Sequence, residues 1–273
     1  MSLLERTKLL LRTHRILPKK TRGQNFIIEP SLFQRMVDYA SLVQDDTVLD
    51  VGAGLGFLAR FMSGRCRTVL AVEADRELAS ILREQLVDVS NAKVVEGDVL
   101  KVEVPPFNKV VSIPPYQISS PLLLWLFNKG FESAILIFQK EFAQRLVASV
   151  GSEDYGWLTV LTYYYADVEL MDDVPKWMFY PQPKIDSVIV RLEPKKPRPF
   201  RLRNEKLFKQ LVQSSFTERN RKVRNAVLSF VRSFCGVPKE KAIEIAEVLP
   251  FREKRVRELA PEDFGALADV LIR

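Results

Sequence analysis

The chain has 273 residues, enough for one large domain or for one large and one small domain. Apolar residues make up 47% and charged residues 27%, values of an ordinary globular protein that exclude a disordered, collagen-like or disulfide-stapled chain. Lys and Arg number 41 against 34 Asp and Glu, and the resulting formal charge of +7 favours a polyanionic partner.

Few residues of the chain could hold a metal ion or act as a nucleophilic triad. Cys66 and Cys235 lie far apart, and His14 is the only histidine of the sequence. We therefore expect no metal site and no Ser/His triad. The segment Met1–Leu11 is interrupted by charged residues and no apolar run is long enough to span a bilayer, so we expect a cytoplasmic protein without membrane contact.

The first half of the chain begins with a basic arm, residues 1–24, that is broken by Pro18. Apolar residues then recur at helical spacing over Pro30–Leu42. After Asp45, short apolar runs alternate with helical stretches. The runs predict strands at Thr47–Val51, Thr68–Glu73, Lys93–Val95, Lys109–Ser112 and Ala134–Phe138. The stretches predict helices at Phe57–Ser63, Arg76–Val87 and Pro121–Phe127. This alternation predicts a doubly wound α/β fold with a parallel sheet.

The second half of the chain changes in character. The runs Leu161–Leu170 and Ser187–Leu192 are separated by a proline-rich loop and predict an antiparallel pair of strands at one sheet edge. The Lys/Arg/Pro cluster Pro194–Pro199 indicates a linker, and the basic residues after it have a helical pattern. We therefore expect three parts: an N-terminal arm 1–24, an α/β domain 25–194 and a small all-helical domain 195–273.

The segment Val48–Gly56 predicts a strand that runs into a glycine-rich turn and a helix. Glycines at 52, 54 and 56 would let a ligand approach the backbone, with amide groups facing it at the helix start. The spacing is GxGxG, whereas the dinucleotide fingerprint is GxGxxG. A tight turn without a ligand is the alternative interpretation of this motif alone.

Acidic residues follow the next two strands: Glu73 ends one, and Asp98 comes directly after the other. Ligands of open α/β sheets bind outside the carboxyl ends of the strands. There one acid can accept hydrogen bonds from ribose hydroxyls and the other from an adenine amino group. Either acid alone could be a solvated loop residue, but their order along the chain favours a nucleoside site.

The fourth strand ends in Ile113-Pro114-Pro115-Tyr116. Proline rigidity would fix a carbonyl as a hydrogen-bond acceptor, and the tyrosine offers a π face to a planar base. Such a sequence can also end a strand without any chemical role. Its position after the two acids is what indicates a substrate site.

Together these motifs resemble the ribosomal RNA adenine dimethyltransferase family, a family of class I S-adenosylmethionine-dependent methyltransferases. The resemblance extends from about Arg22 to Asn225. It rests on Gly23–Ile27, Val48–Gly56, Glu73–Asp75, Gly97–Asp98, Pro115–Pro121, Gln139–Ala143, Phe179–Ser187 and Arg219–Asn225. It implies a Rossmann-like sheet with a small C-terminal helical domain.

The activity implied by the resemblance is dimethylation of the N6 amines of two adjacent adenosines near the 3′ end of small-subunit rRNA. The cofactor would be S-adenosylmethionine, bound by Asn25, Ile27, Gly52, Gly54, Glu73, Asp98 and Ile113. Tyr116 and Phe179 would sandwich the target base, and the Pro114 carbonyl would accept from its amine. The partner would be rRNA in a pre-ribosomal particle, held by a monomer through Lys19, Lys20, Arg219, Arg221, Lys222 and Arg224.

One residue departs from the family pattern. Ile113 stands where the family has an asparagine whose amide accepts a hydrogen bond from the target amine. Loss of one such bond costs about 1 to 3 kcal/mol, or about one to two decades of rate. A non-catalytic rRNA-binding assembly factor of the same family is therefore an alternative, and a methyltransferase acting on another nucleic acid or on a small molecule is a further one.

Overall fold

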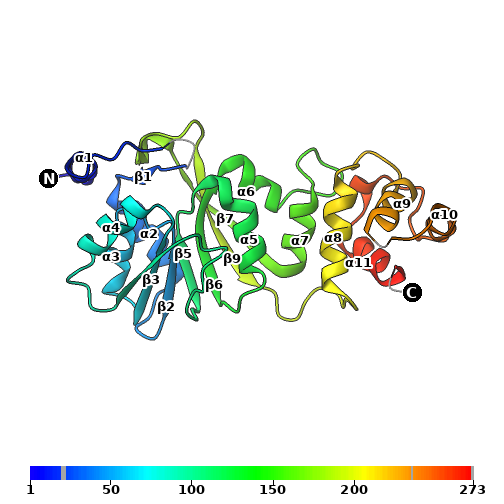
Figure 1. Ribbon diagram of the computed structural model, residues 1–273, viewed down its shortest axis with the longest axis horizontal. Helices are drawn as coiled ribbons and strands as arrows, with labels where there is room; N and C mark the ends of the chain where they lie inside the picture. Colours follow the sequence, from blue (N-terminus) through cyan, green and yellow to red (C-terminus); the bar gives the residue numbers. More distant parts are fainter. Residues whose placement is uncertain (20–22, 235, 272–273) are drawn as a thin grey trace. The chain divides into compact units, whose positions relative to one another are not determined.

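The computed structural model describes residues 1–19, 23–234 and 236–271. Contacts divide the chain into two compact units (Figure 1). The sheet unit comprises Met1–Ala143 and Glu169–Pro194, and the helical unit comprises Gln144–Val168 and Lys195–Arg273. The sequence pattern predicts that 144–168 belong to the α/β domain, whereas these residues pack with the C-terminal helices.

The sheet unit is built on seven strands in the order β4-β3-β2-β5-β6-β9-β7. Their bounds are β2 Thr47–Val51, β3 Thr68–Glu73, β4 Ala92–Glu96, β5 Lys109–Ser112, β6 Ser133–Gln139, β7 Ala166–Val174 and β9 Ser187–Pro194. Strands β2 to β6 are parallel, and β9 pairs antiparallel with β6. The predicted α/β sheet with an antiparallel edge is confirmed.

Burial on both faces explains the apolar strand sequences. All five residues from Ala134 to Phe138 in β6 are 0% exposed. Helix α2 (Pro30–Ala40) packs against β5 and β6, and α3 (Phe57–Ser63) and α4 (Arg76–Gln85) pack against β3 and β4. Two further helices, α5 (Ser119–Leu126) and α6 (Lys140–Leu146), follow β5 and β6 in the chain (Figure 1).

The N-terminal arm begins as a helix, α1 (Leu3–Thr13), which is started by a capping box between Ser2 and Glu5. Its Leu11 is buried with Ile16 against Leu78 of α4. Beyond the arm, a two-residue strand β1 (Phe26–Ile27) pairs with β8 (Phe179–Tyr180). The arm is therefore docked on the sheet unit by apolar contacts as well as by its charges.

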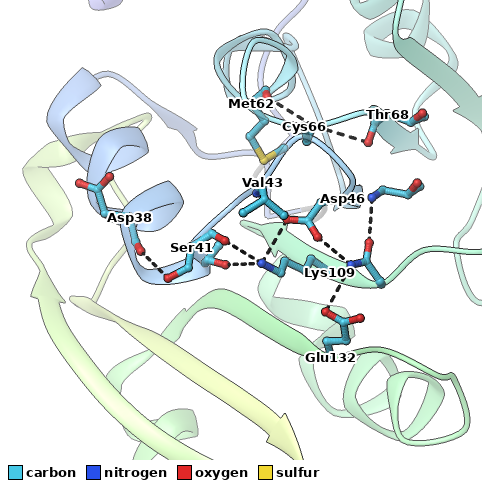
Figure 2. A network of polar contacts seen from close by, with 12 residues as sticks. Asp38, Ser41, Val43, Asp46, Met62, Cys66, Thr68, Lys109 and Glu132 are labelled. Carbon is cyan, nitrogen blue, oxygen red and sulfur yellow. Dashed lines mark hydrogen bonds and ion pairs between the residues drawn. The ribbon is translucent and has the colours of Figure 1, made fainter.

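A polar network closes the amino edge of the sheet, where β2 and β5 begin (Figure 2). The Asp46 carboxylate accepts from the Val43 amide at 2.8 Å and from the Asn108 side chain at 2.7 Å, and it lies 3.1 Å from the Lys109 ammonium. Lys109 also donates to the Ser41 carbonyl at 2.7 Å. Burial opposes ionisation, but these donors outweigh it and lower the pKa of Asp46.

The helical unit contains α7 (Trp157–Tyr165), α8 (Glu205–Phe216), α9 (Val223–Phe234), α10 (Lys239–Glu247) and α11 (Pro261–Val270). Its core is aromatic: the rings of Tyr164 and Phe208 lie 5.3 Å apart, and those of Phe216 and Phe264 lie 5.5 Å apart. The strand predicted at Leu161–Leu170 is wrong in its first half, because 161–165 completes α7 and β7 begins at Ala166. Within the described ranges, no helix has the length and apolar character of a membrane span.

Candidate functional site

A cavity of about 460 Å³ lies at the carboxyl ends of β2 to β5. Parallel strands that start at one sheet edge end at the other, so residues far apart in the chain meet there. All seven residues expected to bind the cofactor line this cavity: Asn25, Ile27, Gly52, Gly54, Glu73, Asp98 and Ile113. The structure therefore brings the predicted cofactor set together.

Glu73 is held rigidly at the end of β3. Its Oε2 accepts from the Gly54 amide at 2.9 Å and its Oε1 accepts from the Asp75 amide at 2.8 Å. The side chain is 7% exposed, and burial raises the pKa of its carboxyl. The two amides fix the carboxylate so that its remaining lone pairs can accept from donor groups of a ligand.

The glycine-rich turn leaves no room for a side chain at its first glycine. Gly52 has a φ of +72°, and a Cβ there would lie 2.7 Å from the Pro115 side chain. The expectation that the turn's amides face a ligand is wrong at four positions. Gly52 and Ala53 donate to the Val72 carbonyl, Gly54 donates to Glu73, and Gly56 donates to the Ala53 carbonyl. The protein itself consumes these four donors, so they are not available to a ligand.

Asp98 and Asn25 both line the cavity, Asp98 directly after β4 and Asn25 directly before β1. Asp98 Oδ1 accepts from the Leu100 amide at 3.0 Å, and its Oδ2 lies 3.5 Å from the exposed Lys101 ammonium. Asn25 donates to the Gly23 carbonyl at 3.3 Å. Both side chains keep polar atoms available for a ligand.

Asp50, which is not among the site residues predicted from the sequence, also belongs to this region. It lies in β2, two residues before Gly52, and is 2% exposed. Burial, with a contribution from the charge of Glu73, raises the pKa of its carboxyl to about 8. Its Oδ2 has no hydrogen-bond partner among the described residues. An aspartate inside an otherwise apolar strand was the signal that could have found it.

Pro114, Tyr116 and Phe179 do not line the cavity, although Ile113 and Pro115 do. Pro114 is buried, and the Tyr116 hydroxyl lies 2.8 Å from Ser187 Oγ. Phe179 is 1% exposed and belongs to the apolar core. The expected sandwich of a base between Tyr116 and Phe179 is therefore not formed here, because the Phe179 ring is buried against other apolar side chains.

Cations expected to hold RNA are largely paired with acids or carbonyls. Lys19 lies 3.3 Å from Asp75 and 3.2 Å from Glu77. Lys20 lies outside the described residues. Arg219 donates to the Glu153 and Ser152 carbonyls at 2.7 and 2.9 Å. These contacts give Lys19 and Arg219 structural roles within their own units.

The remaining three cations of the predicted cluster lie near two acids. Lys222 and Arg224 both contact Glu253, at 2.6 and 2.8 Å, and Arg221 lies 3.3 Å from Glu218. The shared carboxylate lowers the net charge of the cluster. Glu253 lies about 30 residues further along the chain, which is why the sequence pattern alone did not show the pairing.

Comparisons with known proteins agree with one another. The sequence profile of the family described as Ribosomal RNA adenine dimethylase matches residues 17–260. A probable ribosomal RNA small subunit methyltransferase A from Methanosarcina acetivorans is 41% identical over 253 residues, which cover 92% of this chain and 93% of the relative.

Two solved structures share the fold over most of the chain. A dimethyladenosine transferase from Plasmodium falciparum superposes with a TM-score of 0.75 at 30% identity, covering 89% of this chain and 95% of that one. The 23S rRNA methyltransferase ErmE superposes with a TM-score of 0.63 at 28% identity, covering 91% of this chain and 100% of that one.

Proposed function

Because the chain belongs to the ribosomal RNA adenine dimethylase family, we propose that it dimethylates two adjacent adenosines near the 3′ end of small-subunit rRNA. The methyl donor would be S-adenosylmethionine, and the acceptors would be the N6 amines. The relative from Methanosarcina acetivorans is named a small subunit methyltransferase, whereas ErmE is named a 23S rRNA methyltransferase. The more similar relative therefore favours small-subunit rRNA as the substrate.

The chemistry of the cavity carries the cofactor proposal. S-adenosylmethionine is rich in donors and carries positive charge, with ribose hydroxyls, an adenine amine, an ammonium group and a sulfonium centre. The cavity offers the carboxylates of Glu73 and Asp98 between apolar walls that include Phe26 and Ile113. The buried Asp50 precedes Gly52 by two residues and does not itself line the cavity. The residues present therefore fit this molecule.

The reaction needs positioning more than acid–base groups. The cofactor supplies an electrophilic methyl group, and the N6 lone pair attacks it in line. The target adenosine must leave its stack to reach the site. We assign the Pro114 carbonyl as the acceptor that orients the amine and Tyr116 as a face for the base. Phe179 would complete the sandwich only after its ring leaves the core.

Ile113 leaves one acceptor fewer than the family pattern has. The Ile113 side chain packs against the core beside the cavity and cannot accept a hydrogen bond. The Pro114 carbonyl then carries the orientation of the amine alone, so we expect a slower enzyme and not an inactive one. The names of the relatives describe methyltransferases, and the non-catalytic alternative is not favoured.

RNA would be held by cations on each unit, in a monomer that acts on a pre-ribosomal particle in the cytoplasm. We retain Lys19, Lys20, Arg219, Arg221, Lys222 and Arg224 as candidate contacts. Exposed cations without an ion-pair partner in the described part of the helical unit are stronger candidates, since no acid offsets their charge. Those between the linker and the start of α8 are Lys196, Arg201, Arg203 and Lys206.

Mass spectrometry of small-subunit RNA tests the function. Unmethylated small subunits would be incubated with the protein and S-adenosylmethionine, and the RNA digested to oligonucleotides with a base-specific ribonuclease. We expect N6,N6-dimethyladenosine at two adjacent positions near the 3′ end. Methylation of large-subunit RNA only, or of neither RNA while the cofactor binds, would overturn the proposal.

A further inference from the structure

Trp177 is an exposed aromatic residue on a short turn between β7 and β8. Its side chain is 53% exposed, whereas the next two residues, Met178 and Phe179, are 8% and 1% exposed. Exposed tryptophan forfeits much apolar burial, and its flat ring suits stacking contacts. The indole therefore faces solvent on a turn whose neighbours are anchored in the core.

The turn is fixed at several points. The Lys176 amide donates to Asp186 Oδ1 at 2.8 Å, and the Met178 amide donates to the Pro175 carbonyl at 3.0 Å. The Met178 carbonyl accepts from the Ile28 amide at 2.9 Å. Because both the chain before the indole and the chain after it are held, little ordering entropy remains to be lost when a ligand contacts the ring.

The turn that carries Trp177 is also connected to the wall of the cavity and to Tyr116. It leads directly into β8, which pairs with β1, and β1 contributes Phe26 and Ile27 to the wall of the cavity. Asp186, which holds the turn, is followed by Ser187, whose hydroxyl lies 2.8 Å from that of Tyr116. The segment from Trp177 to Ser187 therefore carries both the exposed indole and the hydroxyl that contacts Tyr116.

Two exposed cations lie close to the indole in the chain, together with the Asp186 carboxylate that accepts from the Lys176 amide. Lys176, on the turn before β8, and Lys184, in the loop after β8, are exposed and have no ion-pair partner in the described ranges. Single-stranded nucleic acid is bound where aromatic rings stack on bases and cations track the phosphates. Residues 176–184 contain both an exposed aromatic ring and two cations.

We propose that the Trp177 indole is a stacking platform for an unpaired base of the target RNA outside the adenosine pocket, with Lys176 and Lys184 contacting its phosphates. The inference rests on the proposed function for the identity of the RNA, and it makes Trp177 a substrate-positioning residue. Stacking of a base on an aromatic ring would change RNA affinity about 5- to 150-fold.

Fluorescence of Trp177 alone tests the stacking directly. Trp125 and Trp157 are the other two tryptophans, and Trp125→Phe with Trp157→Phe leaves Trp177 as the single indole. Titration with a single-stranded oligonucleotide of the small-subunit 3′ region should quench its emission with the same midpoint as binding. A fully paired duplex of that sequence should quench much less.

Affinity for the same oligonucleotide would be measured for Trp177→Leu, Trp177→Phe and the control Val87→Ala, whose side chain is 84% exposed after α4. We expect Trp177→Leu to bind about 5- to 150-fold more weakly. Trp177→Phe should stay within a few-fold of wild type, and the control should be unchanged. Affinity for S-adenosylmethionine and the melting temperature should be equal in all four proteins.

Absent quenching, or equal affinity of Trp177→Leu and wild type, would overturn the inference. Weaker binding to small subunits without quenching by the oligonucleotide would show that the ring contacts a protein, and would also overturn it. Quenching by single-stranded RNA with no methyl transfer to small subunits would support the stacking role and contradict the proposed function.

Discussion

Glu73→Gln tests the cofactor pocket at its most ordered side chain. Both carboxylate oxygens accept backbone amides, at 2.9 Å from Gly54 and 2.8 Å from Asp75, and the side chain is 7% exposed. Glutamine keeps the shape, but its NH₂ group must face one of these donors and its oxygen carries no charge. A hydrogen bond to a charged group contributes about 1.5 to 3 kcal/mol, so S-adenosylmethionine should bind about 10- to 150-fold more weakly.

Isothermal titration calorimetry of wild type, Glu73→Gln and Glu73→Ala measures this effect. Glu73→Ala also leaves the Gly54 and Asp75 amides without acceptors, at about 1 to 3 kcal/mol of unfolding free energy for each. The matched control is Glu103→Gln, an exposed residue outside the cavity lining. A dissociation constant for folded Glu73→Gln within threefold of wild type would refute the assignment of Glu73 to the cofactor.

Three further predictions concern the sheet unit. Burial raises the pKa of Asp50 to about 8, so this carboxyl keeps its proton to higher pH in the folded state than in the unfolded state. The free energy of unfolding of wild type should therefore fall relative to that of Asp50→Asn as pH rises from about 4 to 8. The slope is at most about 1.4 kcal/mol per pH unit, and equal urea-derived slopes for the two proteins would contradict it. Asp46→Asn should lower the free energy of unfolding by about 3 kcal/mol, because it leaves the Lys109 ammonium, 12% exposed, without its carboxylate. Adding Lys109→Met should recover part of this loss. Strictly additive effects of the two substitutions would exclude a coupling between Asp46 and Lys109. Ile113→Asn should change methyl incorporation into unmethylated small subunits by no more than about two decades, and Tyr116→Ala should reduce it more strongly; activity in Ile113→Asn alone would mean that the natural protein is not an enzyme.

Strands of the sheet could be predicted because they are buried on both faces and therefore read as short apolar runs. The same signal was misleading at Leu161–Tyr165, which is also apolar and aromatic but lies in α7. There Tyr164 packs against Phe200 and Phe208, with ring centroids 4.9 and 5.3 Å away. A run that is buried all round carries little periodicity, and only the tertiary partners decide between helix and strand.

At the site, the sequence predicted where the cofactor-binding residues lie, but not which of their hydrogen-bonding groups remain free for a ligand. Glu73 and Asp98 meet because strand order brings the carboxyl ends together, and this follows from topology. The donors of the glycine turn are consumed by Val72 and Glu73, an outcome that requires the neighbouring strand to be in place. What remains for a ligand beside these consumed amides includes the carboxylate acceptors of Glu73 and Asp98. The two carboxylates beside the GxGxG turn thus suit a ligand that carries hydrogen-bond donors and positive charge.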